Sequence, residues 1–408
     1  MLYIKRDMEE TFLRISEQFK VVLVTGPRQV GKTTMIKKLM ENSDRKYITL
    51  DDLMLRNLAK NDPEMFIKTY SPPVFIDEVQ YAPELLSYIK IQADERQQKG
   101  DYWLSGSQIF RLMRGVSESL AGRVGLLDLF PLSQNEIYNH KQCIPLETDF
   151  DHLKERASHI PAATPIDIFT RIYNGGMPEI IASENDSRER FYESYVRTYL
   201  ERDVRDISGD INVLKFYRFM VAVAARMAQL LNIKSIADDA EIDQVTAKNW
   251  LNIMETLGLI FYLHPYSNNL LKRTIKSPKL YFYDSGLAAH LTRWSSVHTL
   301  MNGAQSGAFL ENFVISEIMK GWHNCGLRPA LHYYRNKDNK EIDVLWETDG
   351  TVYPLEIKKT STPDLRLAKV FKTLEKSGKI IGSGGIVCMY DDFIPLDKNC
   401  FIIPVRSV

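Results

Sequence analysis

The sequence predicts an α/β fold that begins with a parallel sheet covered by helices. Apolar strand segments alternate with helix-patterned segments through about residue 130, which is typical of such a sheet. A glycine-rich loop stands between the first apolar segment, 21–24, and a helix pattern. A second apolar segment, 74–76, ends in two adjacent acids. Both features belong at one edge of a parallel sheet, where the strands end.

The loop at 26–33 reads Gly-Pro-Arg-Gln-Val-Gly-Lys-Thr, the full spacing of a nucleotide phosphate loop. Its two glycines let backbone amides face phosphate oxygens because no Cβ is in the way. Lys32 is expected to reach the β and γ phosphates, and Thr33 to offer its hydroxyl to Mg²⁺. The sequence therefore predicts an ATP and Mg²⁺ site that includes Gly26, Pro27, Arg28, Gln29, Val30, Gly31, Lys32, Thr33 and Thr34.

The acidic pair after the second apolar segment supplies the rest of the predicted hydrolytic site. Residues 73–78 read Pro-Val-Phe-Ile-Asp-Glu, and the pair lies 45 residues beyond Lys32. Asp77 is expected to hold Mg²⁺ through water, and Glu78 to polarise the attacking water. An acidic pair in a solvated loop is the alternative. The preceding strand and the distance from the loop favour the catalytic interpretation.

Four further polar residues are weaker candidates for contact with the γ phosphate. Ser105 or Ser107, in Tyr-Trp-Leu-Ser-Gly-Ser, could sense this phosphate or could simply form a turn. Arg123 is a candidate charge-stabilising arginine, although most single arginines are surface residues. Arg202 lies in the densely charged segment 199–206, which favours a solvated helix face over a nucleotide contact.

Composition limits the remaining possibilities. A length of 408 residues suggests two to four domains, and 52 basic residues balance 52 acidic ones, so overall charge predicts no partner. The four cysteines have no metal-ligand spacing. The first ten residues lack an apolar signal core, and no 18-residue uncharged apolar run occurs. We therefore expect a cytoplasmic protein without a membrane partner.

The middle of the chain predicts a helical connector at 141–225 and a winged helix at 226–295. The latter combines a helix at 233–237, a second helix at 246–257 and an apolar strand at 259–263. A basic cluster on the expected wing could bind a phosphate backbone, or could be solvated in a protein-binding module. The residues that could reach base edges are Gln244, Thr246, Lys248 and Asn249, and the basic cluster is Lys272, Arg273, Lys276 and Lys279.

The segment after residue 296 predicts a second chemistry, a restriction-nuclease-like site of the PD-(D/E)xK type. Glu311 lies in a helix pattern, Asp343 in a strand pattern, and Glu356 and Lys358 in the next strand. Two acids on adjacent strands can hold magnesium, and a lysine two residues after the second acid can orient water. The predicted metal ligands here are Glu311, Asp343 and Glu356, with Lys358 as their catalytic partner.

Together these segments resemble the prokaryotic AAA-type ATPases of the AAA+ superfamily that carry a C-terminal restriction-nuclease-like domain. The resemblance implies an ATPase domain at 1–140, a connector or lid at 141–225, a winged helix at 226–295 and a nuclease-like α/β domain at 296–408. Ser105 stands where relatives often have threonine. Besides the two nucleotide motifs, the resemblance rests on Leu-Ser-Gly-Ser, Ser-Leu-Ala-Gly-Arg, Tyr-Leu-Glu-Arg-Asp, Ser-Pro-Lys-Leu-Tyr-Phe-Tyr-Asp-Ser-Gly-Leu, Glu-Asn-Phe-Val and Glu-Ile-Asp-Val.

The favoured functional hypothesis is an ATP-hydrolysing switch that reorients the winged-helix and nuclease-like domains, with nucleic acid as the expected load. One alternative is an ATP-gated, Mg²⁺-dependent nuclease that cuts with Asp343, Glu356 and Lys358. Another is a non-catalytic regulator whose winged helix binds DNA or a protein. The oligomeric state is left open by the sequence.

Overall fold

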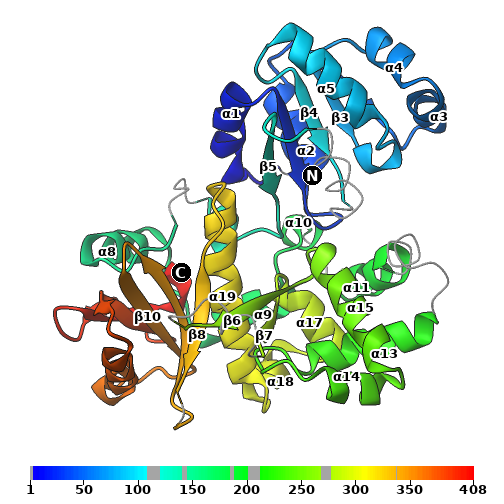
Figure 1. The fold of residues 1–408 in the computed structure, drawn as a ribbon. Helices are drawn as coiled ribbons and strands as arrows, with labels where there is room; N and C mark the ends of the chain where they lie inside the picture. The colour runs from blue at the N-terminus through cyan, green and yellow to red at the C-terminus, as the bar shows by residue number, and fades with distance from the viewer. Residues whose placement is uncertain are drawn as a thin grey trace.

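The computed structural model describes residues 3–107, 120–139, 145–183, 188–200, 212–267, 277–336 and 338–408. Figure 1 shows an N-terminal unit built around a small sheet, joined to a larger body that contains a second sheet. The long helix α19 (Ser306–Asn324) reaches from this body toward the N-terminal unit, and α10 (Pro178–Ala182) lies near their junction. No helix among the described residues combines the length and the apolar character needed to cross a membrane.

The N-terminal sheet is the predicted parallel sheet. Its strand order is β2-β3-β4-β1-β5, and all four neighbouring pairs are parallel. The central strand β1 is buried at all five positions, which explains its continuous apolar sequence. The strands are β1 (Val21–Thr25), β2 (Lys46–Thr49), β3 (Val74–Asp77), β4 (Tyr102–Ser105) and β5 (Val124–Asp128). The helices of this unit include α1 (Met8–Gln18), α2 (Lys32–Met40), α3 (Leu53–Asn61), α4 (Pro63–Thr69) and α5 (Leu85–Arg96).

The chain that leaves this sheet is held by a buried arginine near the N-terminus. Arg6 forms an ion pair with Glu136 at 2.8 Å and donates hydrogen bonds to the carbonyls of Val30, at 2.6 Å, and Phe130, at 2.7 Å. Glu136 belongs to α7 (Gln134–Ile137), which starts with a capping box formed with Ser133. The N-terminal segment, the phosphate loop and the exit from β5 are thus fixed to one another.

The middle of the chain contains the predicted pair of helices followed by a hairpin. A left-handed residue, Glu241 at φ 54°, ends the first helix of the pair, and Asp243 caps the second. The first helices of this region are α8 (Phe150–His159), α9 (Pro165–Asn174), α10, α11 (Arg188–Ser194), the π-helix η2 (Tyr195–Leu200) and α13 (Val213–Ala224). The pair is α14 (Ile233–Ala240) and α15 (Gln244–Thr256), and the antiparallel hairpin is β6 (Ile260–Pro265) with β7 (Lys279–Phe282).

The C-terminal sheet is mixed, in the order β13-β14-β12-β10-β9-β8-β6-β7, with β11 beside β10. β9 is antiparallel to β8 and β10, whereas β10, β12 and β14 run parallel. β6 joins β8 through His264 and His332, so the hairpin shares this sheet across the boundary expected at 295. The remaining elements are α17 (Ser285–Leu291), α18 (Val297–Asn302), β8 (Leu331–Arg335), β9 (Glu341–Thr348), β10 (Thr351–Lys358), the 3₁₀ helix η3 (Leu365–Ser377), β11 (Ile380–Ile381), β12 (Gly384–Cys388), β13 (Ile394–Pro395), β14 (Cys400–Pro404) and η4 (Val405–Ser407).

Helix α19 joins the two sheets through a buried ion pair. Lys320 and Glu317 are 2.8 Å apart, and both side chains are under 5% exposed. Glu317 accepts a hydrogen bond from the amide of Gln134 at 2.7 Å, and Lys320 donates to the carbonyl of Leu132 at 3.3 Å. The segment after β5 is therefore attached to α19 by charged groups that solvent does not reach.

We predict that Lys320→Met lowers the free energy of unfolding by about 3 kcal/mol, because the buried carboxylate of Glu317 loses its counter-charge. Urea unfolding followed by circular dichroism measures the change. Lys38→Met is the matched control, since Lys38 forms an exposed pair with Glu41, and its expected change is under about 0.5 kcal/mol. The double variant Lys320→Met/Glu317→Gln should recover part of the loss. An equal loss in the single and double variants would contradict this explanation.

Candidate functional site

Two positions of the phosphate loop have a backbone conformation that favours glycine. Gly26 has φ 138°, and a Cβ on this residue would lie 2.0 Å from the carbonyl oxygen of Leu129. Gly31, at φ 92°, precedes the first residue of α2. The loop therefore ends at a helix N-terminus, where free amides and the helix dipole favour an anion.

Lys32 is folded onto the loop that contains it. Its ammonium group donates hydrogen bonds to the carbonyls of Gly26, at 2.9 Å, and Pro27, at 2.7 Å. The residue is 7% exposed. Its charge is thus held at the centre of the loop, where the sequence predicts the phosphates.

The carboxylate of Asp77 accepts hydrogen bonds from hydroxyl groups on three other elements. Thr33, at the start of α2, donates to it at 2.9 Å, and Tyr47 in β2 donates at 3.2 Å. Ser105, at the end of β4, also donates to this carboxylate. Thr33 and Asp77 provide hard oxygen atoms, the donors that Mg²⁺ prefers, so these two residues fit the predicted ion. The structure thus brings Thr33, Asp77 and Ser105 together at one edge of the sheet.

Glu78 follows in a left-handed backbone conformation, at φ 57°. The side-chain amide of Gln80 contacts its carboxylate and also donates to the hydroxyl of Ser107 at 3.3 Å. Gln80 is buried and was not identified from the sequence. Its position in Asp-Glu-Val-Gln, two residues after the predicted catalytic acid, was the available signal.

A cavity of about 800 Å³ opens beside these residues. One side is formed by the phosphate loop, the start of α2 and Glu78. The other side comes from α10 and α11, far along the sequence. Sequence reasoning assigned this region only to a connector, so it missed these lining residues, which are Pro178, Glu179, Arg190, Phe191 and Ser194.

Arg190 is the cation on the far side of this cavity, and its side chain is exposed. A smaller cavity of about 130 Å³ adjoins the loop and is lined mainly by apolar groups. Its lining includes Tyr3, Ile4, Val30, Leu132, Pro178 and Ala182. The two cavities adjoin at Gly31, Thr34 and Pro178, which line both.

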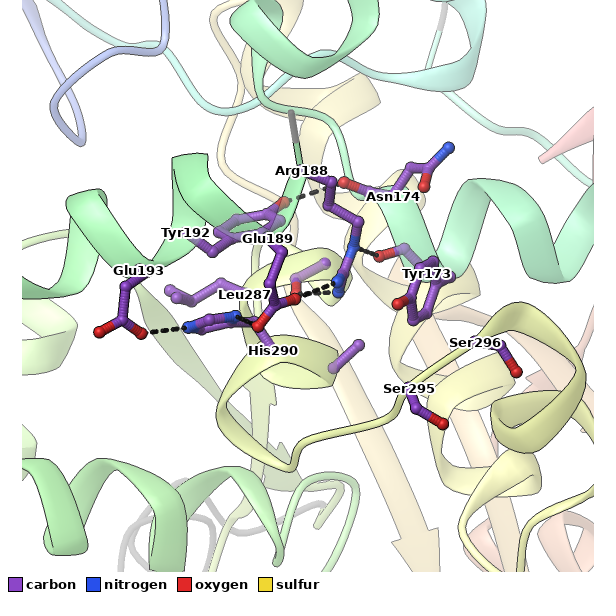
Figure 2. Close-up of polar contacts among 12 residues, drawn as sticks. Tyr173, Asn174, Arg188, Glu189, Tyr192, Glu193, Leu287, His290, Ser295 and Ser296 are labelled. Atoms are coloured by element: carbon purple, nitrogen blue, oxygen red, sulfur yellow. Dashed lines mark hydrogen bonds and ion pairs between the residues drawn. The ribbon is translucent and has the colours of Figure 1, made fainter. Parts of the chain in front are cut away.

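The opposite face of α11 is anchored to helix α17, as Figure 2 shows. The guanidinium of Arg188 donates to the carbonyls of Tyr173, at 2.7 Å, and Gly286, at 3.1 Å. The buried hydroxyl of Tyr192 donates to Asp284, the N-cap of α17, at 2.6 Å. Asp284 also accepts the amide of Gly176 at 2.8 Å. One short helix thus lines the cavity on one face and holds α17 on the other.

A buried histidine also lies between these two helices. In Figure 2, His290 of α17 points toward two glutamates of α11, with Nδ1 3.1 Å from Glu189 and Nε2 3.8 Å from Glu193. Burial lowers the pKa of His290, although both carboxylates act in the opposite direction. Burial therefore outweighs the two charges and favours the neutral ring.

The expectation that Arg123 serves this site within the same chain is wrong. Its carbonyl accepts the amide of Val21, so Arg123 lies beside the start of β1, whereas the phosphate loop follows the end of that strand. Its guanidinium is held by Asp94 through contacts of 2.7 and 2.9 Å. Arg202 lies outside the described residues.

The predicted residues of the C-terminal site also lie close together. Lys358 is 2.6 Å from Glu356 and 3.6 Å from Asp343, and Asp343 accepts the amide of Ile357 at 2.7 Å. Burial, with the charge of Asp343 as the second cause, raises the pKa of Glu356 to about 7 and that of Glu311 to about 7. One oxygen of Glu356, Oε2, is buried without a hydrogen-bond partner.

The acids of this cluster are paired with lysines. Within the described ranges, no three His, Cys, Asp or Glu side chains form a group that could hold a metal ion. Instead, the ammonium of Lys279 lies 3.0 Å from Glu311 and also contacts Glu341. The hydroxyl of Tyr281 donates to the same oxygen of Glu311 at 2.7 Å. Two lysine ammonium groups thus offset part of the charge of the four carboxylates in this cluster.

This placement corrects the expectation that Lys279 belongs to a basic surface. Lys279 is 4% exposed. Burial alone would lower its pKa, but the charges of Glu311, Glu341 and Asp343 together outweigh burial and raise it. The other members of that predicted cluster, Lys272, Arg273 and Lys276, lie outside the described residues.

The predicted recognition helix α15 exposes three of the four predicted residues, Gln244, Lys248 and Asn249. Thr246 instead donates to the capping carboxylate of Asp243 at 2.6 Å. Two of the acids that precede this end of the helix are ion-paired, Asp239 with Arg226 at 2.5 Å and Glu241 with Arg218 at 3.0 Å.

Comparison with known families supports the first part of these predictions. Residues 18–138 match the family model of an AAA domain, so an AAA-type ATPase domain at the N-terminus is confirmed. Residues 166–298 and 306–408 match two domains of unknown function, DUF8612 and DUF4143. These matches do not show a nuclease.

Similar proteins and structures were also found. The chain is 28% identical over 368 residues to the uncharacterized protein Rv2008c of Mycobacterium tuberculosis, covering 90% of this chain and 76% of that protein. It is 24% identical over 330 residues to the uncharacterized protein MJ1637 of Methanocaldococcus jannaschii, covering 73% of this chain and 67% of that protein.

Among solved structures, a Walker-type ATPase of Pyrococcus abyssi has 15% identity and a TM-score of 0.45, covering 71% of this chain and 96% of its own. The Thermotoga maritima RuvB Holliday junction branch migration motor has 14% identity and a TM-score of 0.32. The match covers 63% of this chain and 89% of that chain. Because both TM-scores are below 0.5, these likenesses carry no argument about function.

We predict that Arg190→Ala weakens nucleotide binding about fivefold, because it removes an exposed cation facing the phosphate loop, an effect of about 1 kcal/mol. Titration with a fluorescent ATP analogue measures this change. Arg197→Ala is the matched control, since Arg197 is exposed and pairs with Glu193 outside the cavity lining. The same affinity in the Arg190 variant and the unmodified protein would exclude the contact.

Proposed function

We propose that this chain binds ATP with Mg²⁺ at the phosphate loop, hydrolyses it, and uses the nucleotide state to reposition its helical and C-terminal parts. The observation that carries the proposal is the meeting of Thr33, Asp77 and Ser105 at one sheet edge beside Lys32. Loop, hydroxyl and carboxylate are combined there in the arrangement that phosphoryl transfer requires.

The residues of the loop have separable tasks. Lys32 would exchange the carbonyls of Gly26 and Pro27 for phosphate oxygens, which carry more negative charge and form stronger hydrogen bonds. Thr33 and Asp77 would hold Mg²⁺, which supplies charge neutralisation on the phosphates. Ser105 would keep Asp77 oriented through its hydroxyl group.

Glu78 is the proposed general base for the attacking water. Its carboxylate lines the cavity and accepts a hydrogen bond from the side-chain amide of Gln80. The same amide donates to the hydroxyl of Ser107, just after β4. We infer that Gln80 sets the direction of Glu78, so the γ phosphate can influence the base through Ser107. This assigns Gln80 a positioning role.

Coupling to the rest of the chain would pass through α11. Arg190 and Phe191 face the nucleotide cavity, whereas Tyr192 on the same helix is bound to Asp284 at the start of α17. Closure of α11 on a bound triphosphate would therefore move α17 with it. α17 directly follows the hairpin strand β7, so the movement would reach the C-terminal sheet.

The part of the chain that this switch acts on is a helix pair with an antiparallel hairpin, the order expected for a winged helix. The exposed residues Gln244, Lys248 and Asn249 of α15 are the candidate contacts for a DNA or protein partner.

Replacing Lys32 with alanine should reduce ATP affinity at least roughly tenfold, because a charge-assisted contact to the phosphates is lost. Isothermal titration calorimetry with Mg²⁺ present gives the dissociation constant. Lys38→Ala on the same helix is the control, since Lys38 is exposed and pairs with Glu41. If both variants bind ATP like the unmodified protein, the triphosphate is not bound at this loop.

For Glu78→Gln we expect ATP binding to remain and steady-state hydrolysis to fall by roughly a hundredfold or more, because the amide cannot accept a proton from water. Phosphate release measures turnover, and the calorimetric assay measures binding. Unchanged turnover in a variant that binds ATP normally would remove Glu78 from its assigned role.

A further inference from the structure

We propose that Lys279 is a built-in cation of the C-terminal acid cluster. Its ammonium group takes the position at which a divalent metal ion would neutralise Glu311 and its neighbours, and it keeps the folded cluster free of metal. The cluster then serves as an ion-pair connection between the hairpin and the C-terminal sheet. This inference is independent of ATP binding.

The contacts of Lys279 are those of an internal counter-ion. Its ammonium is 3.0 Å from Glu311 on α19 and contacts Glu341 at the start of β9. Its side chain is 5% exposed, against 38% for Lys358, the lysine predicted from the sequence. A buried charge at this distance from two carboxylates satisfies them directly.

The backbone that carries Lys279 is fixed. In the same strand, the amide of Phe282 donates to the side chain of Asn312 on α19 at 2.7 Å, and Asn312 donates back to the Phe282 carbonyl at 3.1 Å. Asn312 is adjacent to Glu311 in the sequence and is fully buried. Lys279 and Glu311 are therefore held in register by neighbouring hydrogen bonds.

Repulsion between like charges is the reason why we expect a metal ion and this lysine to exclude each other. Four carboxylates, those of Glu311, Glu341, Asp343 and Glu356, face two ammonium groups, Lys279 and Lys358. A divalent ion among these acids would lie close to the buried ammonium, and like charges repel strongly where water is excluded. Loss of Lys279 would leave the four acids with one cation and create an attractive site for a divalent ion.

The position of Lys279 also links the cluster to the hairpin. β7 is paired with β6, and the hairpin follows the helix pair α14 and α15 in the chain. A displacement of β7 from α19 would withdraw the ammonium group and expose the acids together. Metal binding would then depend on where the hairpin lies.

The test is Mn²⁺ binding to the full chain without nucleotide, followed by the electron paramagnetic resonance signal of free Mn²⁺. Five proteins are compared: the unmodified chain, Asp343→Asn, Lys279→Met, Lys279→Arg and Lys279→Met/Asp343→Asn. We expect a site in Lys279→Met that is absent from the other four proteins. Dependence on Asp343 separates it from Mn²⁺ bound near Asp77, and Lys279→Arg keeps the charge.

Two results would overturn the proposal. One is Mn²⁺ binding by the unmodified chain that Asp343→Asn removes, since the cluster would then hold metal beside Lys279. The other is a folded Lys279→Met protein that gains no site. Circular dichroism establishes folding. If Lys279→Met does not fold, Lys279→Gln takes its place, since its amide can still donate a hydrogen bond to Glu311. The result for the unmodified chain needs no variant at Lys279.

Discussion

The carboxylate of Asp77 is the interaction on which the proposed nucleotide site depends. A parallel sheet brings the ends of β1, β3 and β4 to one edge, so the loop after the first strand, the acid of the second and the hydroxyl of the third must meet. Thr33, Tyr47 and Ser105 all donate to this one carboxylate. Its orientation is therefore fixed before any ligand binds, which is the form of preorganisation that phosphoryl transfer relies on.

A second constraint is that helix α11 borders the cavity on one face and packs against other helices on the opposite face. Arg190 and Phe191 border the cavity, while Arg188 and Tyr192 are buried against α9 and α17. A helix fixed on one side cannot approach a ligand without moving its partner, because packed interiors do not deform continuously. The nucleotide cavity and the C-terminal sheet are thereby joined by contacts between a few short helices.

The sequence predicted the features that depend on local spacing. Glycine positions, an apolar strand and an acidic pair are read within a few residues, so the phosphate loop and Asp77 were found. Long-range contacts were missed. Arg190 lines the same cavity as the loop although it lies more than 150 residues further along the chain. Lys279 was expected in solvent, but β6 joins the C-terminal sheet through β8 and buries the start of β7 against α19. Arg123 was misplaced because its motif does not indicate at which end of β1 it lies.

A crystal structure of the chain with a nonhydrolysable ATP analogue and Mg²⁺ would test the proposed nucleotide site. We expect the ammonium of Lys32 to leave the carbonyls of Gly26 and Pro27 for the β and γ phosphates. We also expect the ion to lie between the Thr33 hydroxyl and Asp77. An analogue bound elsewhere, or one bound here while Lys32 still contacts both carbonyls and Asp77 faces no ion, would contradict the proposed site.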